Sequence, residues 1–143
     1  MSFVPDTQQG ATFVVSDLSV TMTTEDIGSI GLTHPTIAIP HLGSTGQVPY
    51  IPGDLSDTEE FTVTHQNFGK SPKPVQGAVY TVTVTAPIAT GSSSAESWAG
   101  TAICTHVGTP PFAANANELQ KVETRWKFDG GQGGSAFART PAT

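Results

Sequence analysis

The chain has 143 residues, of which 36% are hydrophobic and only 13% are charged, and its formal net charge at pH 7 is −6. This length fits one domain, the single cysteine excludes an intrachain disulfide, and the acidic balance argues against a sequence-specific DNA reader, which needs clustered Lys and Arg. The 21 threonines are β-branched and suit a pleated surface, so the composition favours an all-β protein.

The first half of the chain contains two weaker strand patterns and one clear one. The weaker ones cover residues 12–22 and 36–42, and Pro40, which has no backbone donor, predicts that the second is an edge strand or is bulged. Residues 49–57, PYIPGDLSD, form an acidic, turn-dense run. A clear strand follows over residues 59–67 because apolar and polar residues alternate. Its inward face is predicted to carry Phe61, Val63 and His65, and its outward face Thr62, Thr64 and Gln66.

The second half contains three further strand patterns. Residues 79–86 alternate valines with Thr81, Thr83 and Thr85. Residues 98–107 form a weaker strand, in which Val107 is expected on the face opposite Cys104. A short helix is expected over residues 113–120, and residues 121–128 alternate between apolar and charged side chains.

These elements predict a β-sandwich or small barrel of six to eight mostly antiparallel strands with little helix, spanning residues 12–130. Residues 1–11 are expected to form an N-terminal arm, and the glycine-dense residues 131–143 a flexible C-terminal arm. The start of the chain lacks the pattern of a signal peptide and no apolar run could span a bilayer, so a soluble protein made in the cytoplasm is expected.

No chemical site is evident in the sequence. The four histidines lie too far apart for a preformed zinc site, and the run GGQGG after Asp129 lacks the Lys and Ser or Thr of a phosphate-binding loop. Cys104 falls in an apolar strand, where buried and unreactive thiols are usual. We therefore expect no catalytic residue, no metal and no cofactor. Trp98 and Trp126 could form a sugar-binding platform or pack in the core.

The charges are distributed unevenly along the chain. Residues 1–69 carry eight acids and no Lys or Arg, whereas residues 70–143 carry six bases and four acids, a net +2. Acidic and basic faces of this kind would attract one another between copies in head-to-tail self-association. The alternative is that the acids only keep a charge-poor protein in solution.

Four stretches in order carry a family resemblance: PTIAIPHLGSTGQVPYIPGDLSDTEEFTVTHQN (35–67), YTVTVTAP, SWAGTAICTHVG and LQKVETRWKFDGG. Together they resemble the major tail protein, or tail tube subunit, of long-tailed bacteriophages. The resemblance implies a virion protein, assembled in the host cytoplasm, whose hexameric rings stack into a tube. Tape measure protein and then double-stranded DNA would pass through that tube without specific binding, and tail terminator and baseplate proteins would be further partners. No membrane is implied.

The resemblance also implies a role for the acidic run. In the family an extended loop at this place reaches a neighbouring subunit or the next ring, so residues 49–57 are expected to contact another copy; an ordinary surface turn is the alternative. The expected contact residues are Pro49, Tyr50, Ile51, Pro52, Gly53, Asp54 and Asp57, with Lys70, Lys73 and Arg125 as their partners on the other copy. The threonine faces, Thr62, Thr64, Thr81, Thr83 and Thr85, are candidates for the lumen. A head decoration or neck protein, or a carbohydrate-binding module, remains an alternative function.

Overall fold

The computed structural model describes residues 10–18, 24–41, 43, 45–66, 73–109 and 121–143. These residues form eleven strands. Their bounds are β1 Thr12–Val15, β2 Thr24–Ile27, β3 Leu32–Thr33, β4 Thr36–Ala38, β5 Tyr50–Pro52, β6 Asp57–Thr58, β7 Phe61–Gln66, β8 Val79–Thr85, β9 Ser97–Val107, β10 Lys121–Phe128 and β11 Ala138–Thr140. The expected helix at 113–120 lies outside the described residues.

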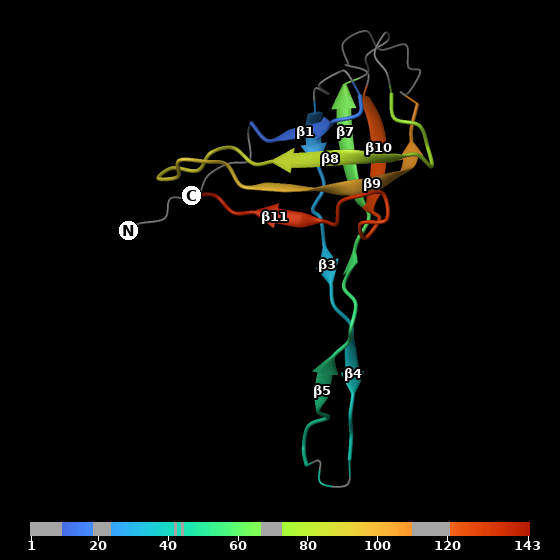
Figure 1. Ribbon diagram of the computed structural model, residues 1–143, viewed down its shortest axis with the longest axis vertical. Coiled ribbons are helices and arrows are strands. Elements are labelled where there is room, and N and C mark those ends of the chain that lie inside the picture. The colour runs from blue at the N-terminus through green and yellow to red at the C-terminus, as the bar shows by residue number, and fades with distance from the viewer. Residues whose placement is uncertain (1–9, 19–23, 42, 44, 67–72, 110–120) are drawn as a thin grey trace.

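Seven of these strands form one antiparallel sheet in the order β1-β8-β9-β10-β7-β2, with β11 paired to β9. The sheet curls back on itself, as the contact between β1 and β2 at its two ends shows. In Figure 1, β8 and β9 cross β7 and β10 at a steep angle, as in orthogonally packed sheets. We call this curled sheet the barrel. The predicted all-β, mostly antiparallel fold is confirmed.

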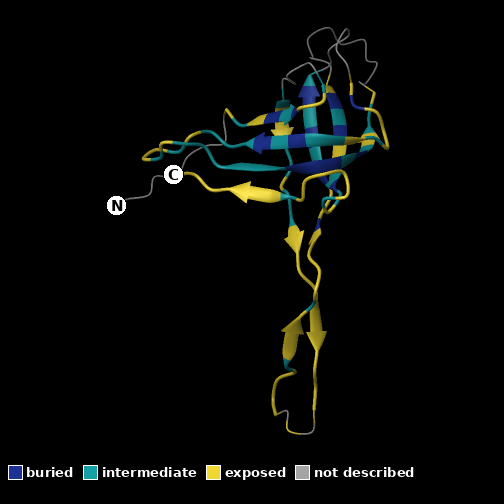
Figure 2. Cartoon of the chain, viewed as in Figure 1, coloured by how far each residue is buried: buried dark blue, intermediate teal, exposed yellow. Residues whose placement is uncertain are grey.

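The core lies between the crossing strands and is made by the alternation seen in the sequence. Along β7 and β10, buried residues alternate with residues that are partly or fully exposed (Figure 2). Trp126 is fully buried, and its ring centroid lies 5.4 Å from that of Phe13 on β1 and 5.9 Å from that of Tyr80 on β8. These aromatic contacts join the two crossing layers across the core.

The predicted faces of β9 are wrong at its end. The register between β9 and β10 shifts, so that Trp126 pairs with Cys104 but Arg125 pairs with His106. Thr105 is therefore the extra residue of a β-bulge, and every side chain after it changes face. Val107 consequently packs against the core on the same side as Cys104, while His106 is exposed.

The C-terminal segment, expected to be flexible, carries a strand. β11 pairs with β9 from Ala138 opposite Ala99 to Thr140 opposite Ser97, and the Phe137 ring lies 4.7 Å from that of Phe128. A polar and glycine-rich sequence gives no strand signal of its own. β11 forms because β10 pairs with β9 only from Ala102 onward, which leaves the start of the long strand β9 available for pairing on that side. In the part of the chain that the structure describes, no helix is long and apolar enough to cross a lipid bilayer.

Candidate assembly surface

Residues 28–60, which we call the arm, project from the barrel as a narrow two-stranded ribbon (Figure 1). The ribbon continues the pairing of β2 with β7. Ile27 pairs with Val63 inside the barrel, the Gly28 amide donates to the Thr62 carbonyl at 2.6 Å, and Leu32 then pairs with Thr58 in unchanged register. The arm is therefore an outgrowth of two barrel strands rather than a separate loop.

The outer part of the arm is a second short ladder between β4 and β5. Ile37 pairs with Ile51, Ala38 pairs with Tyr50, and the Ile39 amide donates to the carbonyl of Pro49 at 2.9 Å. The strand expected over residues 36–42 thus ends at Ala38, before Pro40. It is an edge strand, as its proline predicts.

A bulge separates the two ladders. Four residues, 53–56, stand opposite His34 and Pro35. The His34 ring spans the bulge, because its Nδ1 lies 2.7 Å from the Ser56 hydroxyl and its Nε2 lies 2.6 Å from the Gly53 carbonyl oxygen. A carbonyl oxygen can only accept, so Nε2 donates this second hydrogen bond. Leu55 is turned outward by the bulge and is 79% exposed.

The arm exposes most of the large apolar side chains that the described residues leave in solvent. Figure 2 shows the arm exposed along most of its length. Seven of ten such residues lie on it: Leu32, Ile37, Ile39, Val48, Tyr50, Ile51 and Leu55. Residues 35–53 also contain no Lys, Arg, Asp or Glu. Natural proteins protect free strand edges with charges, and isolated two-stranded hairpins are marginally stable in water. An apolar, uncharged ribbon of this kind is typical of a surface that a partner covers.

The contact residues expected from the sequence between Pro49 and Asp57 all lie on the returning half of the arm, just before β5, in β5, in the bulge after it and at the start of β6. The outgoing half of the arm was not expected to make contacts, although it carries the exposed side chains of Leu32, Ile37 and Ile39. The absence of charge from residues 35–53 is the signal that could have found both strands together.

The cations expected to meet this surface have different positions. Lys70 lies outside the described residues, and Lys73 is exposed in the segment before β8. Arg125 forms an ion pair with Glu123 of its own strand, with 2.9 Å between Nε and Oε1. The Asp57 carboxylate lies 3.5 Å from Nζ of Lys127 in the same chain. Ion pairs to another copy at Asp57 or Arg125 would therefore compete with pairs inside the chain.

The threonines considered for the lumen lie on two opposite outer faces. β7 and β8 are three steps apart in the curled sheet, and their inward valines, Val63 and Val82, belong to one core. Their outward threonines consequently point in opposite directions. Thr62 and Thr64 stand opposite Arg125 and Glu123. Thr81, Thr83 and Thr85, in contrast, stand beside uncharged partners on β9, namely Thr101, Ala99 and Ser97.

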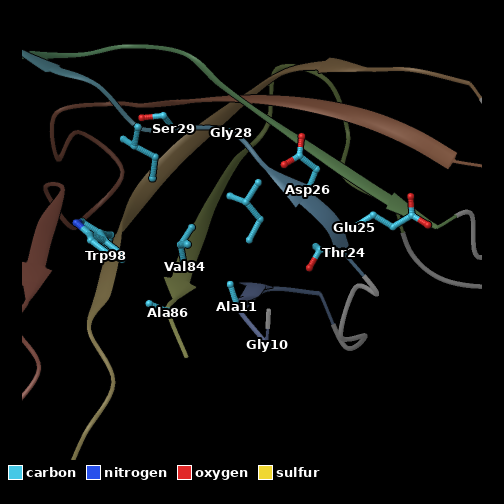
Figure 3. A pocket seen from close by; sticks show the side chains of 12 residues that line it. Gly10, Ala11, Thr24, Glu25, Asp26, Gly28, Ser29, Val84, Ala86 and Trp98 are labelled. Carbon is cyan, nitrogen blue, oxygen red and sulfur yellow. The ribbon is translucent and has the colours of Figure 1, made fainter. Parts of the chain in front are cut away.

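A pocket of about 630 Å³ opens where β1 and β2 approach each other (Figure 3). It is lined by Val84, Trp98 and Ile30, and by Glu25 and Asp26 of β2. The Glu25 carboxylate forms a 2.9 Å ion pair with Lys121, and the hydrogen bond from that lysine lowers the pKa of Glu25.

The two tryptophans do not form an exposed pair. Trp98 lines this pocket and packs against the core. Trp126 is fully buried and donates a 2.9 Å hydrogen bond to the Thr124 hydroxyl. A flat sugar-binding platform made of both rings is therefore absent. Among the described residues, no group of three His, Cys, Asp or Glu side chains could hold a metal ion.

No protein-family model matches this sequence, and no curated protein matches it. Solved structures, in contrast, share its fold along nearly the whole chain. A chain in the cryo-EM structure of the PVC extracellular contractile injection system, sheath/tube terminator in the extended state, has a TM-score of 0.72 at 15% identity and covers 96% of this chain and 98% of that one.

Two other structures are similar to the same degree. A chain of the PVC sheath-tube complex in the extended state has a TM-score of 0.68 at 17% identity, covering 97% of this chain and 93% of that one. A chain of the anti-feeding prophage tube terminating cap has a TM-score of 0.68 at 14% identity, covering 99% and 95%. The chain therefore has a fold that occurs in components of contractile injection systems.

Proposed function

We propose that this chain is a structural tube subunit of a phage tail or of a related contractile injection system, and that its copies self-assemble into hexameric rings that stack into a tube. The observation that carries the proposal is the arm, whose exposed apolar side chains and uncharged residues 35–53 require a covering surface. The shared fold supports the same conclusion.

The arm would make the contact between subunits. Its returning strand, from Pro49 to Asp57, docks on a neighbouring copy, and the proline content of this strand lowers the conformational entropy that docking removes. If the contact between an arm and a barrel is not reciprocated by the second copy, it is heterologous, and such a contact builds rings or filaments instead of closed dimers.

The threonine row of β8 is the better candidate for the lumen. Thr81, Thr83 and Thr85 lie among small, uncharged residues of β9, whereas Thr62 and Thr64 stand beside charged side chains of β10. A polar surface without cations makes no strong contact with phosphates, so double-stranded DNA would slide past it. Tape measure, terminator and baseplate proteins are the further partners of such a tube.

Electron microscopy of negatively stained protein over a concentration series, with the mass measured by sedimentation, tests the proposal. Rings or tubes with a central channel are expected. In the matched variant, residues 34–56 are replaced by Asn-Gly, which joins Thr33 to its direct partner Asp57 by a two-residue turn. This armless variant should keep the folded barrel and remain monomeric.

Other results would favour other functions. Trimers or rings that never stack would indicate a head decoration or neck protein. A chain that stays monomeric and whose tryptophan fluorescence shifts with added sugar would indicate a carbohydrate-binding module. An armless variant that forms the same rings as the full chain would contradict the role proposed for the arm.

A further inference from the structure

The outer part of the arm has two apolar faces. Directly opposite residues of an antiparallel pair share a face, and successive pairs alternate. The pair Ile37 and Ile51 therefore lies on one face, which we call the isoleucine face, together with Ile39. The next pair, Ala38 and Tyr50, lies on the other face, which we call the tyrosine face.

A single flat partner would cover only one of these faces. A hairpin that packs on one surface carries apolar residues toward that surface and polar residues toward water. Here Ile51 is 43% exposed on one side of the ribbon and Tyr50 is 60% exposed on the other. No charged side chain stands on either face between residues 35 and 53. The two faces consequently require two covering surfaces.

The barrel offers two apolar places that the arm of the same chain points away from (Figure 1). Apart from the arm, the described residues expose three large apolar side chains, and these are Val75, Val79 and Ile88. Val75 and Val79 lie in and beside the turn that begins β8, and Ile88 lies just beyond the end of β8. β8 has seven residues, so these places are about 20 Å apart at about 3.3 Å per residue. One arm face cannot cover both.

We infer that the arm is clamped between two other copies of this chain, with its isoleucine face on one copy and its tyrosine face on a second. Each copy then contributes the two apolar faces of its arm and accepts two arms from other copies, one at each end of β8. The inference rests on the proposed self-assembly and adds that each arm joins three subunits, so that it links copies in two directions at once.

Two neighbouring residues of β5 allow a matched test. Ile51→Cys places a thiol on the isoleucine face and Tyr50→Cys places one on the tyrosine face. The native Cys104 is fully buried, so the unsubstituted protein supplies the background. The rate of reaction with a small maleimide is measured for each variant in dilute subunits and in assembled particles, while mass and electron microscopy record assembly independently.

Both thiols are expected to react about tenfold or more slowly in the particles than in the subunits, because a covered group reacts only through an opened state. Particles in which one thiol keeps its subunit rate would show an arm covered on one face, which overturns this inference and leaves the proposed function standing. Particles in which both keep that rate would exclude the arm from the contacts. A chain that forms no particles at any concentration would overturn the proposed function and this inference with it.

Discussion

The carboxylate of Asp57 lies 3.5 Å from the ammonium group of Lys127, and the same ammonium group donates a 3.0 Å hydrogen bond to the carbonyl of Thr58. Beside it, the Thr105 hydroxyl donates a 2.8 Å hydrogen bond to Glu60. β9 and β10 thus hold the base of the arm through polar side chains.

Asp54 and Asp57 should respond differently to replacement by Ala. Asp57→Ala removes an exposed ion pair inside the chain, so the free energy of unfolding should fall by less than about 1 kcal/mol. Asp54 forms no ion pair with any described residue, so Asp54→Ala should leave stability unchanged and weaken only assembly. Urea denaturation and sedimentation measure the two effects. Assembly of Asp54→Ala at the wild-type concentration would remove this residue from the contact.

The double variant Ile37→Ser, Ile51→Ser should separate assembly from folding. Both side chains are half exposed and lie outside the core, so the barrel should unfold at nearly the same urea concentration as the wild type. Assembly should be lost, because the isoleucine face loses apolar area that a partner would bury. Ile51→Val is the control and should assemble. A double variant that forms normal particles would contradict the apolar contact.

Asp129 should stabilise the turn before β11. Its carboxylate accepts hydrogen bonds from the Thr101 hydroxyl at 2.7 Å and from the amides of Gly131 and Gly133 at 2.9 and 2.7 Å. Desolvation raises the pKa of Asp129, but these hydrogen bonds to the charged form outweigh it, so the pKa lies below its ordinary value of 3.8. Asp129→Asn should therefore lower the free energy of unfolding by about 1 kcal/mol at pH 7.

The pH dependence of that difference has a definite sign. A carboxyl whose pKa is lowered by folding contributes stability above its unfolded pKa and loses the contribution as pH falls through its folded pKa. The gap between wild type and Asp129→Asn should thus be constant above about pH 5 and shrink below pH 3.8. Gln132→Ala, in the same turn, is the control. A gap that is independent of pH would show that the charge of Asp129 contributes nothing.

Thr124→Val should destabilise the core although it preserves volume. The Thr124 hydroxyl accepts the hydrogen bond from the Trp126 indole and donates at 3.3 Å to the carbonyl of Val63. Removing it leaves a fully buried indole N–H without its partner, which should lower the free energy of unfolding by roughly 1–3 kcal/mol. Urea denaturation followed by tryptophan fluorescence measures this. Thr124→Ser, which keeps the hydroxyl, should recover part of the loss.

The sequence predicts the barrel strands well where alternation is strict. β7, β8 and β10 lie within one or two residues of their expected bounds, because a period of two needs only local residues to be recognised. The end of β9 was assigned to the wrong face because its bulge depends on the register with β10, which is a distant segment. Which face of the sheet Val107 lies on is therefore decided by the pairing of β9 with β10 and not by the sequence of β9 alone.

The sequence draws attention to the residues of the candidate surface but does not predict the structure that they form. Proline and glycine in residues 49–57 predict turns, yet Tyr50–Pro52 is a strand, because β4 pairs with it. The pairing of Asp57 with Lys127 joins residues far apart in the chain and follows from where β6 meets β10. The contact of residues 49–57 with another copy stays a prediction, and the ion pair of Asp57 with Lys127 inside the chain was not expected from the sequence.

The unchanged register from β2 and β7 into the base of the arm also determines how the molecule bears force. A pull on the arm along its length runs parallel to both of its strands, so the two strands share it as tension. The backbone hydrogen bonds between β7 and β10 are then loaded together in shear and do not open one after another. The arm would then carry tension into the strands beside the core, whereas the bulge at His34 is the place where it would bend.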